Sequence, residues 1–290
     1  MENNIIWLAS YPKSGNTWFR SFLTALLNQG TIDINKMETD GIYSAKEYIE
    51  SILDLCADDL RPREFESFRK LAFSYKAQNT KKEAFVKIHD AYTYSRWDGL
   101  PLIPDTGSRV AIYLVRNPLD VVLSLANHTG LTIDETITKY INSEEGAFIK
   151  KGKAAQQYYQ LMGTWSMHAE SWLNQKDIPV HLIRYEDMKA NAFETFKEAV
   201  QQMQLNYTDE AIAKAVAACD FKKLKQQEEN KGFKEKQIPA SAFFFKGEIG
   251  RWKKELNEEQ IKKIMTVNEL MMKRLGYWDE TIKQLEDYGK

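Results

Sequence analysis

The most constraining feature of this sequence is the alternation of short apolar runs with longer helical patterns. Residues 5–9, 84–89, 109–115 and 180–185 form four such runs, rich in β-branched and large apolar side chains. Short continuous runs of this composition are typical of strands that are buried on both faces of a sheet. Because helical patterns separate them, the strands are expected to form βαβ units, in which they run parallel. The sequence therefore predicts an α/β fold with a central, mostly parallel sheet and helices on both faces.

Three helices are predicted to follow these strands. Large apolar residues repeat at helical spacing over residues 18–27, and Gly30 suits the position just after a helix. A second helix is predicted for residues 118–125, where a proline occupies the first turn, and a third for about 193–203.

Two further stretches, residues 31–82 and 128–172, are largely helical in pattern and more polar. We interpret them as helical insertions around the sheet, not as separate domains. We therefore predict a single domain over residues 1–290, a length that suffices for one large core.

Composition argues against several classes of protein. The chain is 43% hydrophobic and 28% charged, with a formal net charge of −1. Proteins that bind nucleic acid or membrane surfaces generally carry an excess of one charge, so we expect neither partner. Cys56 and Cys219 are too few for a disulfide framework and form no C-x-x-C pair, so both are expected to be reduced and buried. The N-terminus has no basic region followed by a long apolar segment, so we expect a cytoplasmic protein.

The loop after the first predicted strand has the composition of a phosphate site. Residues 10–18 read Ser-Tyr-Pro-Lys-Ser-Gly-Asn-Thr-Trp and lead into the first predicted helix. A strand that turns at a glycine into a helix leaves backbone N–H groups without partners, and these groups bind phosphate together with the helix dipole. The loop is P-loop-like, but its lysine precedes the glycine and no leading glycine is present. The alternative is a polar turn that caps the helix through Asn16 or Thr17.

Residues 11–18 resemble the 5′-phosphosulfate loop Y-P-K-[SA]-G-[TN]-[TN]-W of the sulfotransferases that use 3′-phosphoadenosine-5′-phosphosulfate (PAPS), at all eight positions. The resemblance implies that Lys13 contacts the phosphosulfate near its bridging oxygen and that Trp18 packs on the adenine. It also implies that the backbone and hydroxyls of the next four residues hold the 5′-phosphate, namely Ser14, Gly15, Asn16 and Thr17.

The loop after the third predicted strand begins with Arg116, and Ser124 follows two turns into the next helix. An arginine at this place presents paired N–H donors that suit a phosphate, although an arginine after a strand is also commonly part of a surface ion pair. The segment resembles the sulfotransferase element R-[ND]-P-x-D-x-x-x-S at every defined position. The resemblance implies that Arg116 and Ser124 bind the 3′-phosphate, the group that distinguishes PAPS from ATP.

Residues 243–253 resemble a third sulfotransferase segment, R-K-G-x-x-G-x-W, which closes over the 3′-phosphate and the adenosine. The matching residues are Lys246, Gly247, Gly250 and Trp252. Phe245 stands where the family has arginine, and Arg251 stands where it has an acidic residue. One 3′-phosphate contact is therefore in question, and the sequence leaves open whether Arg251 replaces it.

Two aromatic residues complete the implied donor site. Phe221 resembles the aromatic residue of the family's T-S-F turn, which sandwiches the adenine opposite the loop tryptophan. Tyr185 matches a recurrent Y-E-D sequence near the adenine. For both residues, packing in the core is the alternative.

Sulfuryl transfer needs a base for the acceptor, and histidine is the natural candidate because its unperturbed pKa is about 6.5. His89 ends the second predicted strand, at the edge where α/β sheets place their sites. Residues 87–89 resemble the family's K-[TS]-H, with isoleucine at the middle position. The resemblance implies that His89 is the general base and that Lys87 stabilises the transferring group. Of the other histidines, His168 and His181 are assigned to packing. His128 follows the helix that contains Ser124, and a place in the acceptor pocket is the less favoured of its interpretations.

The resemblance covers essentially the whole chain and implies a sulfotransferase that moves a sulfuryl group from PAPS to a hydroxyl or amine of a small acceptor. In-line transfer without a metal would release 3′,5′-bisphosphoadenosine (PAP). The alternatives are a small-molecule kinase-like nucleotide enzyme and a non-catalytic protein that binds the nucleotide bisphosphate. Residues 31–82 and 128–172 are expected to shape the acceptor site, while the acceptor and the oligomeric state are not indicated. Candidate aromatic residues for its lining are Tyr92, Tyr94, Trp97, Tyr158 and Tyr159.

Overall fold

A computed structural model describes residues 3–56, 60, 62–95, 98–145, 160–237, 239–244 and 246–288. Its centre is a five-stranded sheet in which all strands run parallel, in the order β2-β3-β1-β4-β5. The strands are β1 (Ile5–Ser10), β2 (Asp40–Ile42), β3 (Ala84–Ile88), β4 (Ser108–Val115) and β5 (Val180–Arg184). Four of them coincide with the predicted strands, so the predicted parallel α/β fold is confirmed.

The edge strand β2 was not expected, because the whole of residues 31–82 was assigned to a helical insertion. This strand has only three residues, Asp-Gly-Ile, and pairs with β3. So short and polar a strand carries no periodic signal, and it is specified by the open backbone edge of β3. The rest of this stretch is helical where the structure describes it, with α2 (Lys46–Leu53) and α3 (Pro62–Asn79).

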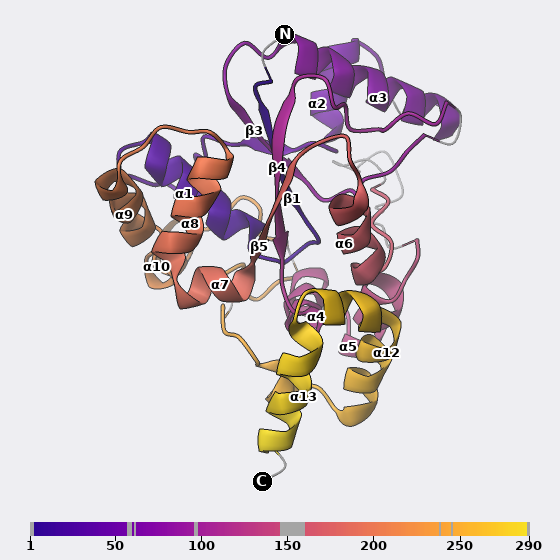
Figure 1. Ribbon diagram of the computed structural model, residues 1–290, viewed down its shortest axis with the longest axis vertical. Helices are drawn as coiled ribbons and strands as arrows, with labels where there is room; N and C mark the ends of the chain where they lie inside the picture. Colours follow the sequence, from indigo (N-terminus) through magenta and orange to yellow (C-terminus); the bar gives the residue numbers. More distant parts are fainter. Residues whose placement is uncertain are drawn as a thin grey trace.

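Helices cover both faces of the sheet, as predicted (Figure 1). Ile6 and Leu8 of β1 belong to the core on one face, and Trp7 and Ala9 belong to the core on the other. The first core is closed by α1 (Asn16–Leu27), α8 (Ala192–Gln202) and α9 (Asp209–Ala218). The second is closed by α4 (Pro118–Thr129), α6 (Trp165–Asn174) and α12 (Glu258–Arg274). Since strand side chains alternate between faces, a continuous apolar run such as β1 can serve both cores.

The remaining helices are α5 (Ile133–Thr136), the π-helical η2 (Ile137–Ile141), α7 (Tyr185–Ala190), α10 (Phe221–Lys231), α11 (Trp252–Glu255) and α13 (Tyr277–Tyr288). The three predicted helices correspond to α1, α4 and α8. The expected position of Gly30 directly after the first helix was wrong, because α1 ends at Leu27 and Asn28 is its C-cap. Gly30 has a φ of 90° and donates its N–H to the Ala25 carbonyl at 2.6 Å, which completes the turn after the helix.

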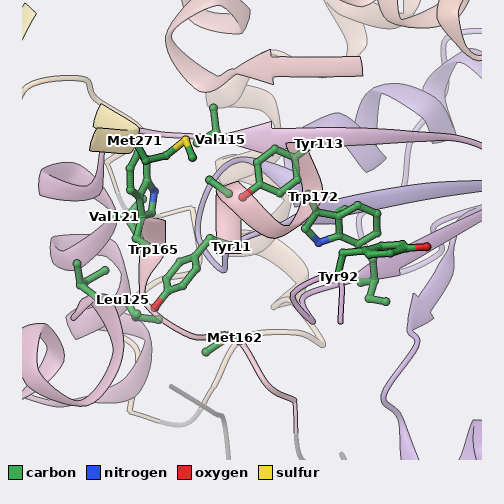
Figure 2. Packing of buried hydrophobic residues seen from close by; sticks show 14 of the residues in the cluster. Tyr11, Tyr92, Tyr113, Val115, Val121, Leu125, Met162, Trp165, Trp172 and Met271 are labelled. Atoms are coloured by element: carbon green, nitrogen blue, oxygen red, sulfur yellow. The ribbon is translucent and has the colours of Figure 1, made fainter. Parts of the chain in front are cut away.

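An aromatic core lies on the α6 side of β4 (Figure 2). The Trp172 ring stacks on Tyr113 with ring centroids 6.3 Å apart and meets Tyr92 edge-on at 5.3 Å. Tyr92 is only 3% exposed, so the structure assigns it to the core and not to an acceptor pocket. Tyr94 is exposed, and its hydroxyl and that of Tyr92 both donate to Asp177. The other three proposed aromatic residues, Trp97, Tyr158 and Tyr159, lie outside the described residues.

The two cysteines differ in their surroundings. Cys219 is buried, as expected, but Cys56 is exposed, because it lies in the polar stretch after α2 and not against the sheet. Within the described ranges, none of the helices is both long and apolar enough to span a lipid bilayer.

Candidate active site

The predicted site residues gather at one edge of the sheet. The strands are parallel, so the segments that follow them all leave from their carboxyl ends. Lys13 follows β1, His89 follows β3 and Arg116 follows β4, while Tyr185 opens α7 directly after β5. Residues that are far apart in the sequence are therefore brought to a common edge by the fold.

The loop between β1 and α1 is a tight turn that opens the helix without a side-chain cap. Lys13 and Gly15 both have left-handed backbone, with φ values of 70° and 101°, and Gly15 is the N-cap. The alternative interpretation, a turn capped by Asn16 or Thr17, is therefore wrong. Asn16 instead donates its amide to the Leu8 carbonyl at 2.8 Å, which ties the loop to its own strand. The backbone N–H groups of the first turn have no helical partners and are available to an anion.

Two further features of this loop fit a bound anion. The Ser14 hydroxyl is fully buried and has no hydrogen-bond partner in the part of the chain that the structure describes. A Cβ on Gly15 would lie 2.8 Å from both Tyr185 and Met188, so the backbone can take this shape only with glycine. Thr17 is 8% exposed at the start of α1. A buried hydroxyl without a partner is costly, and a phosphate oxygen would supply that partner.

The residues predicted to surround the adenine lie close to one another. The Trp18 ring is edge-on to Tyr185, with ring centroids 5.9 Å apart, and its indole N–H donates to the Cys219 carbonyl at 3.0 Å. The Tyr185 hydroxyl donates to the Gly247 carbonyl at 3.0 Å. A Cβ on Gly247 would lie 2.5 Å from the Phe221 ring, so this glycine allows close packing.

Lys189 is a neighbour of this group that the sequence did not indicate. Its ammonium lies 5.7 Å from the Trp18 ring and 5.5 Å from the Phe221 ring. The two rings predicted to sandwich the adenine thus face a common cation. The stacking roles of Trp18 and Phe221 remain predictions.

Arg116 is buried, so the alternative of a surface ion pair is wrong. Its NH2 donates to the Glu248 carbonyl at 2.8 Å, and its guanidinium lies 4.3 Å from the Tyr185 ring centroid. The Arg116 Nε is buried and has no partner among the described residues. Ser124, the other predicted ligand of the 3′-phosphate, is half-buried in the second turn of α4. The Arg116 side chain thus retains an unused N–H donor, which fits a phosphate.

Asp120 connects this loop to the third motif, a role that no pattern in the sequence indicates. Its carboxylate accepts from the Gly250 N–H at 2.7 Å and from the Trp252 N–H at 3.3 Å, and the residue is 1% exposed. Its place in the R-[ND]-P-x-D element singles out the residue but not this role. Together with the bond between Arg116 and Glu248, these contacts hold the C-terminal segment against the loop after β4.

Two basic residues of the third motif share one carboxylate. Lys246 is exposed and pairs with Glu255 at 3.1 Å. Arg251 is buried and bonds the same carboxylate, with its closest contact at 2.8 Å. Arg251 is therefore engaged by Glu255 in this structure. Phe245 lies outside the described residues.

The hydrogen bonds of His89 define its tautomer. Its Nδ1 lies 2.8 Å from the Ser10 carbonyl oxygen, which can only accept, so Nδ1 carries the proton and Nε2 carries the lone pair. Burial and the nearby Lys87 ammonium hold the pKa of His89 well below its usual range. The imidazole is therefore neutral at pH 7, the state that a general base requires.

His168 contacts the backbone of His89, and the His168 ring is neutral at pH 7. Its Nε2 donates to the His89 carbonyl at 3.1 Å, which leaves Nδ1 to accept from the Tyr113 hydroxyl at 2.8 Å. Burial lowers the pKa of His168 to about 4, and the Tyr11 ring meets it edge-on. These contacts agree with the packing role expected of His168.

The two predicted catalytic lysines are half-buried and close enough for their charges to repel. The Lys13 ammonium lies 3.9 Å from the Phe243 ring centroid, and the Lys87 ammonium pairs with Glu235 at 2.9 Å. Burial, together with repulsion from Lys87 and Arg116, lowers the pKa of Lys13 to about 7. The site thus concentrates positive charge in a chain whose net charge is near zero.

His128, at the end of α4, belongs to the same neighbourhood. Its ring meets Phe243 edge-on with centroids 6.3 Å apart. Burial, followed by repulsion from Lys13 and Lys87, lowers the pKa of His128 to about 3. The predicted place of His128 in the acceptor pocket remains a prediction, whereas His181 lies within β5 and is only half-buried.

No group of three or more potential metal ligands is present among the residues that the structure describes.

Comparison with curated proteins gives relatives that match over most of this chain. The chain is 24% identical to cytosolic sulfotransferase 17 of Arabidopsis thaliana, over 94% of this chain and 76% of that protein. It is 25% identical to flavonol 3-sulfotransferase of Flaveria bidentis, over 94% and 82%. It is 26% identical to sulfotransferase 1E1 of Bos taurus, over 85% and 76%.

Solved structures share the fold. A mouse sulfotransferase in complex with PAP superposes with a TM-score of 0.57 at 20% identity, over 94% of this chain and 86% of that one. A retinol dehydratase in complex with androsterone and PAP superposes with a TM-score of 0.61 at 18% identity, over 94% and 82%. The family model described as the sulfotransferase domain matches residues 3–276. The chain therefore belongs to the sulfotransferase family.

Proposed function

We propose that this protein transfers a sulfuryl group from PAPS to a hydroxyl or amine of a small acceptor, with His89 as the general base. The observation that carries the proposal is the convergence of a neutral histidine with three basic side chains, Lys13, Lys87 and Arg116, at one edge of the sheet. Arg116 is buried and the two lysines are half-buried. Cations placed where negative charge develops stabilise the transition state. A neutral imidazole with a free lone pair can take the acceptor's proton.

Donor binding is assigned to two elements. The first turn of α1, with the Ser14 hydroxyl and the N–H groups up to Thr17, holds the 5′-phosphate. Arg116, through its unused Nε, and Ser124 hold the 3′-phosphate. The orphaned donors at Ser14 and Arg116 support this assignment, because each would gain a charged partner.

The aromatic cluster around Trp18 is assigned to binding of the adenine. Tyr185 and Phe221 are its other aromatic members, and Gly247 and Lys246 belong to the segment that closes over the nucleotide. The close packing of Gly247 on Phe221 and its hydrogen bond from Tyr185 support this arrangement.

PAPS supplies the sulfuryl group, and the protein supplies the proton acceptor and the positive charge. The His89 Nε2 takes the proton of the acceptor hydroxyl as its oxygen bonds to sulfur. The bond from sulfur to the 5′-phosphate oxygen breaks in the same step, and the released electron pair stays on that oxygen. Lys13 stabilises the charge that develops there, and Lys87 stabilises the sulfuryl oxygens. These cations fill the role that Mg²⁺ has in kinases, so we propose that no metal takes part.

The acceptor is proposed to be a small molecule with a hydroxyl or amine. The relatives include a protein named flavonol 3-sulfotransferase, and androsterone is bound in the retinol dehydratase structure. The cytosolic sulfotransferases among the relatives support a cytoplasmic location. Neither nucleic acid nor membrane is proposed as a partner.

Calorimetric binding of PAP, AMP and ATP without added metal tests this function. PAP is expected to bind at least ~10-fold more tightly than AMP, because a charge-assisted phosphate contact contributes about 1.5–3 kcal/mol. A clear preference for PAP over both nucleotides would justify a screen of small acceptors with PAPS. Equal binding of PAP and ATP would overturn the donor assignment in favour of a kinase-like enzyme. Binding of PAP without turnover of any acceptor would favour a non-catalytic protein.

A further inference from the structure

A half-buried carboxylate connects Lys87 to a segment that none of the motifs covers. Glu235 lies between α10 and the third motif, and its two oxygens face different cations. The Oε1 accepts from the Arg20 NH1 at 2.8 Å, and the Oε2 accepts from the Lys87 Nζ at 2.9 Å. Arg20 is held on its far side by Thr39, whose hydroxyl accepts from the Arg20 Nε at 2.8 Å.

The fold explains why Lys87 needs this partner. Lys87 lies beside Leu8 in the neighbouring strand, and Leu8 belongs to the core that α1 covers. The lysine side chain is 12% exposed there, and an ammonium without a counter-charge in such a place is unfavourable. In the described part of the chain, Glu235 is the one carboxylate that pairs with Lys87.

Resting on the proposed sulfotransferase function, we propose that Glu235 is a positioning residue for Lys87. Its carboxylate holds the ammonium at the end of β3 and keeps it protonated among the other cations of the site. An ammonium has three N–H donors, so a bond to Glu235 leaves donors for the oxygens of a transferring group.

The charges around Lys87 make Glu235 important for its protonation. Among the described residues, none that faces Lys87 from the neighbouring elements, other than Glu235, is negatively charged. The basic ones are Lys13, in the loop after β1, and Arg20, in α1. The neutral ones are His89, after β3, and His128, at the end of α4. Burial lowers the pKa of Lys87, Glu235 opposes this effect, and Arg20 adds to it. Although burial alone raises the pKa of Glu235, Lys87 and Arg20 together hold it below its usual range. The carboxylate is therefore charged at neutral pH and compensates the ammonium.

The direct test is the titration of Lys87 in Glu235→Gln, which keeps the shape of the side chain and removes its charge. The lysine ε-carbons are labelled with ¹³C, and the Lys87 signal is assigned from Lys87→Arg. The acid dissociation constant of Lys87 is expected to rise at least ~10-fold, because an opposite charge at this distance shifts a pKa by about one unit or more. An unchanged constant in a folded Glu235→Gln variant would overturn the proposal.

Two further variants separate this effect from a general disturbance. Thr39→Val removes the far-side bond of Arg20 and is expected to leave the titration of Lys87 unchanged. Glu235→Asp keeps the charge, so Lys87 should titrate closer to its wild-type value than in Glu235→Gln. The reverse order of the two Glu235 variants would contradict a charge effect.

Binding experiments relate the inference to the proposed function. Wild type and Glu235→Gln are expected to bind PAP alike, while the preference for PAPS over PAP falls in the variant as the pH rises. Failure of the wild type to bind PAP would overturn the proposed function but not the coupling between Glu235 and Lys87. A PAPS preference that Glu235→Gln leaves unchanged at every pH would overturn the positioning role.

Discussion

Replacement of Arg116 by alanine should lower the affinity for PAP much more than the affinity for AMP. Arg116 is 6% exposed and its Nε donor is unused, whereas its NH2 already bonds Glu248. A lost charge-assisted hydrogen bond to the 3′-phosphate costs about 1.5–3 kcal/mol, which corresponds to a ~10- to 150-fold rise in the Kd for PAP. AMP lacks the 3′-phosphate, so its affinity reports only indirect effects, such as loosening of Tyr185 or of the Glu248 segment.

The assay is calorimetric titration of both nucleotides into wild type, Arg116→Ala and a matched control. Arg184→Ala is the control, because Arg184 likewise lies at the carboxyl end of a strand and over a tyrosine ring, 4.4 Å from the Tyr277 centroid against 4.3 Å from the Tyr185 centroid for Arg116. Arg184 lies outside the predicted motif, so its variant should leave the ratio of PAP to AMP affinity unchanged. Loss of PAP and AMP affinity by the same factor in Arg116→Ala would refute the assignment of the 3′-phosphate.

Four other results are expected. His89→Ala should lower turnover ~10²- to 10⁴-fold and leave PAP affinity intact, in a sulfation assay with an acceptor from the screen; near-normal turnover would exclude His89 as the base. Gly15→Ala places a Cβ on left-handed backbone 2.8 Å from Tyr185, so denaturant unfolding should show a loss of about 1–3 kcal/mol, and unchanged stability would contradict the close packing. His168 has a folded pKa of about 4 because of burial, so the unfolded chain binds its proton first, and stability should fall as the pH drops from about 6.5 to about 4. The expected loss is ~3 kcal/mol at 1.36 kcal/mol per pKa unit, and His168→Gln should flatten this slope in unfolding measured across pH. Lys13 has a pKa of about 7, so PAP binding near pH 7 should take up a proton, seen as a binding enthalpy that depends on the ionisation enthalpy of the buffer; no such dependence would place the phosphates elsewhere.

The strands and the turn between β1 and α1 were predictable because their signals are local. A continuous apolar run such as β1 is dictated by burial on both faces, and the loop at residues 10–18 follows it directly in the chain. The parallel order of the sheet then brings His89 and Arg116 to the same edge as Lys13.

Contacts made by residues distant in the chain were not predictable. Glu235 is 148 residues from Lys87, and it lies in a polar stretch where a glutamate has no distinguishing pattern. The short strand β2 depends on the open edge of β3, and Tyr92 joined the core because α6 brings Trp172 against it. Each of these features depends on where a separate part of the chain is placed, and periodicity within a window carries no such information.

The charges of the site favour an anion beside Lys13. Arg116 has the Asp120 carboxylate at 4.0 Å and Lys87 has Glu235, whereas the Lys13 ammonium lies over the Phe243 ring and only the more weakly acting Glu235 and Glu228 raise its pKa. A ring face attracts a cation far less than a carboxylate does, and burial next to two other cations leaves Lys13 only partly protonated near pH 7. A phosphate group beside Lys13 would supply the missing negative charge, so donor binding and protonation of Lys13 favour each other. Buried cations need anionic partners, so a loop that gathers them carries a recognisable pattern in a single sequence, whereas apolar packing around a small molecule makes no comparable demand.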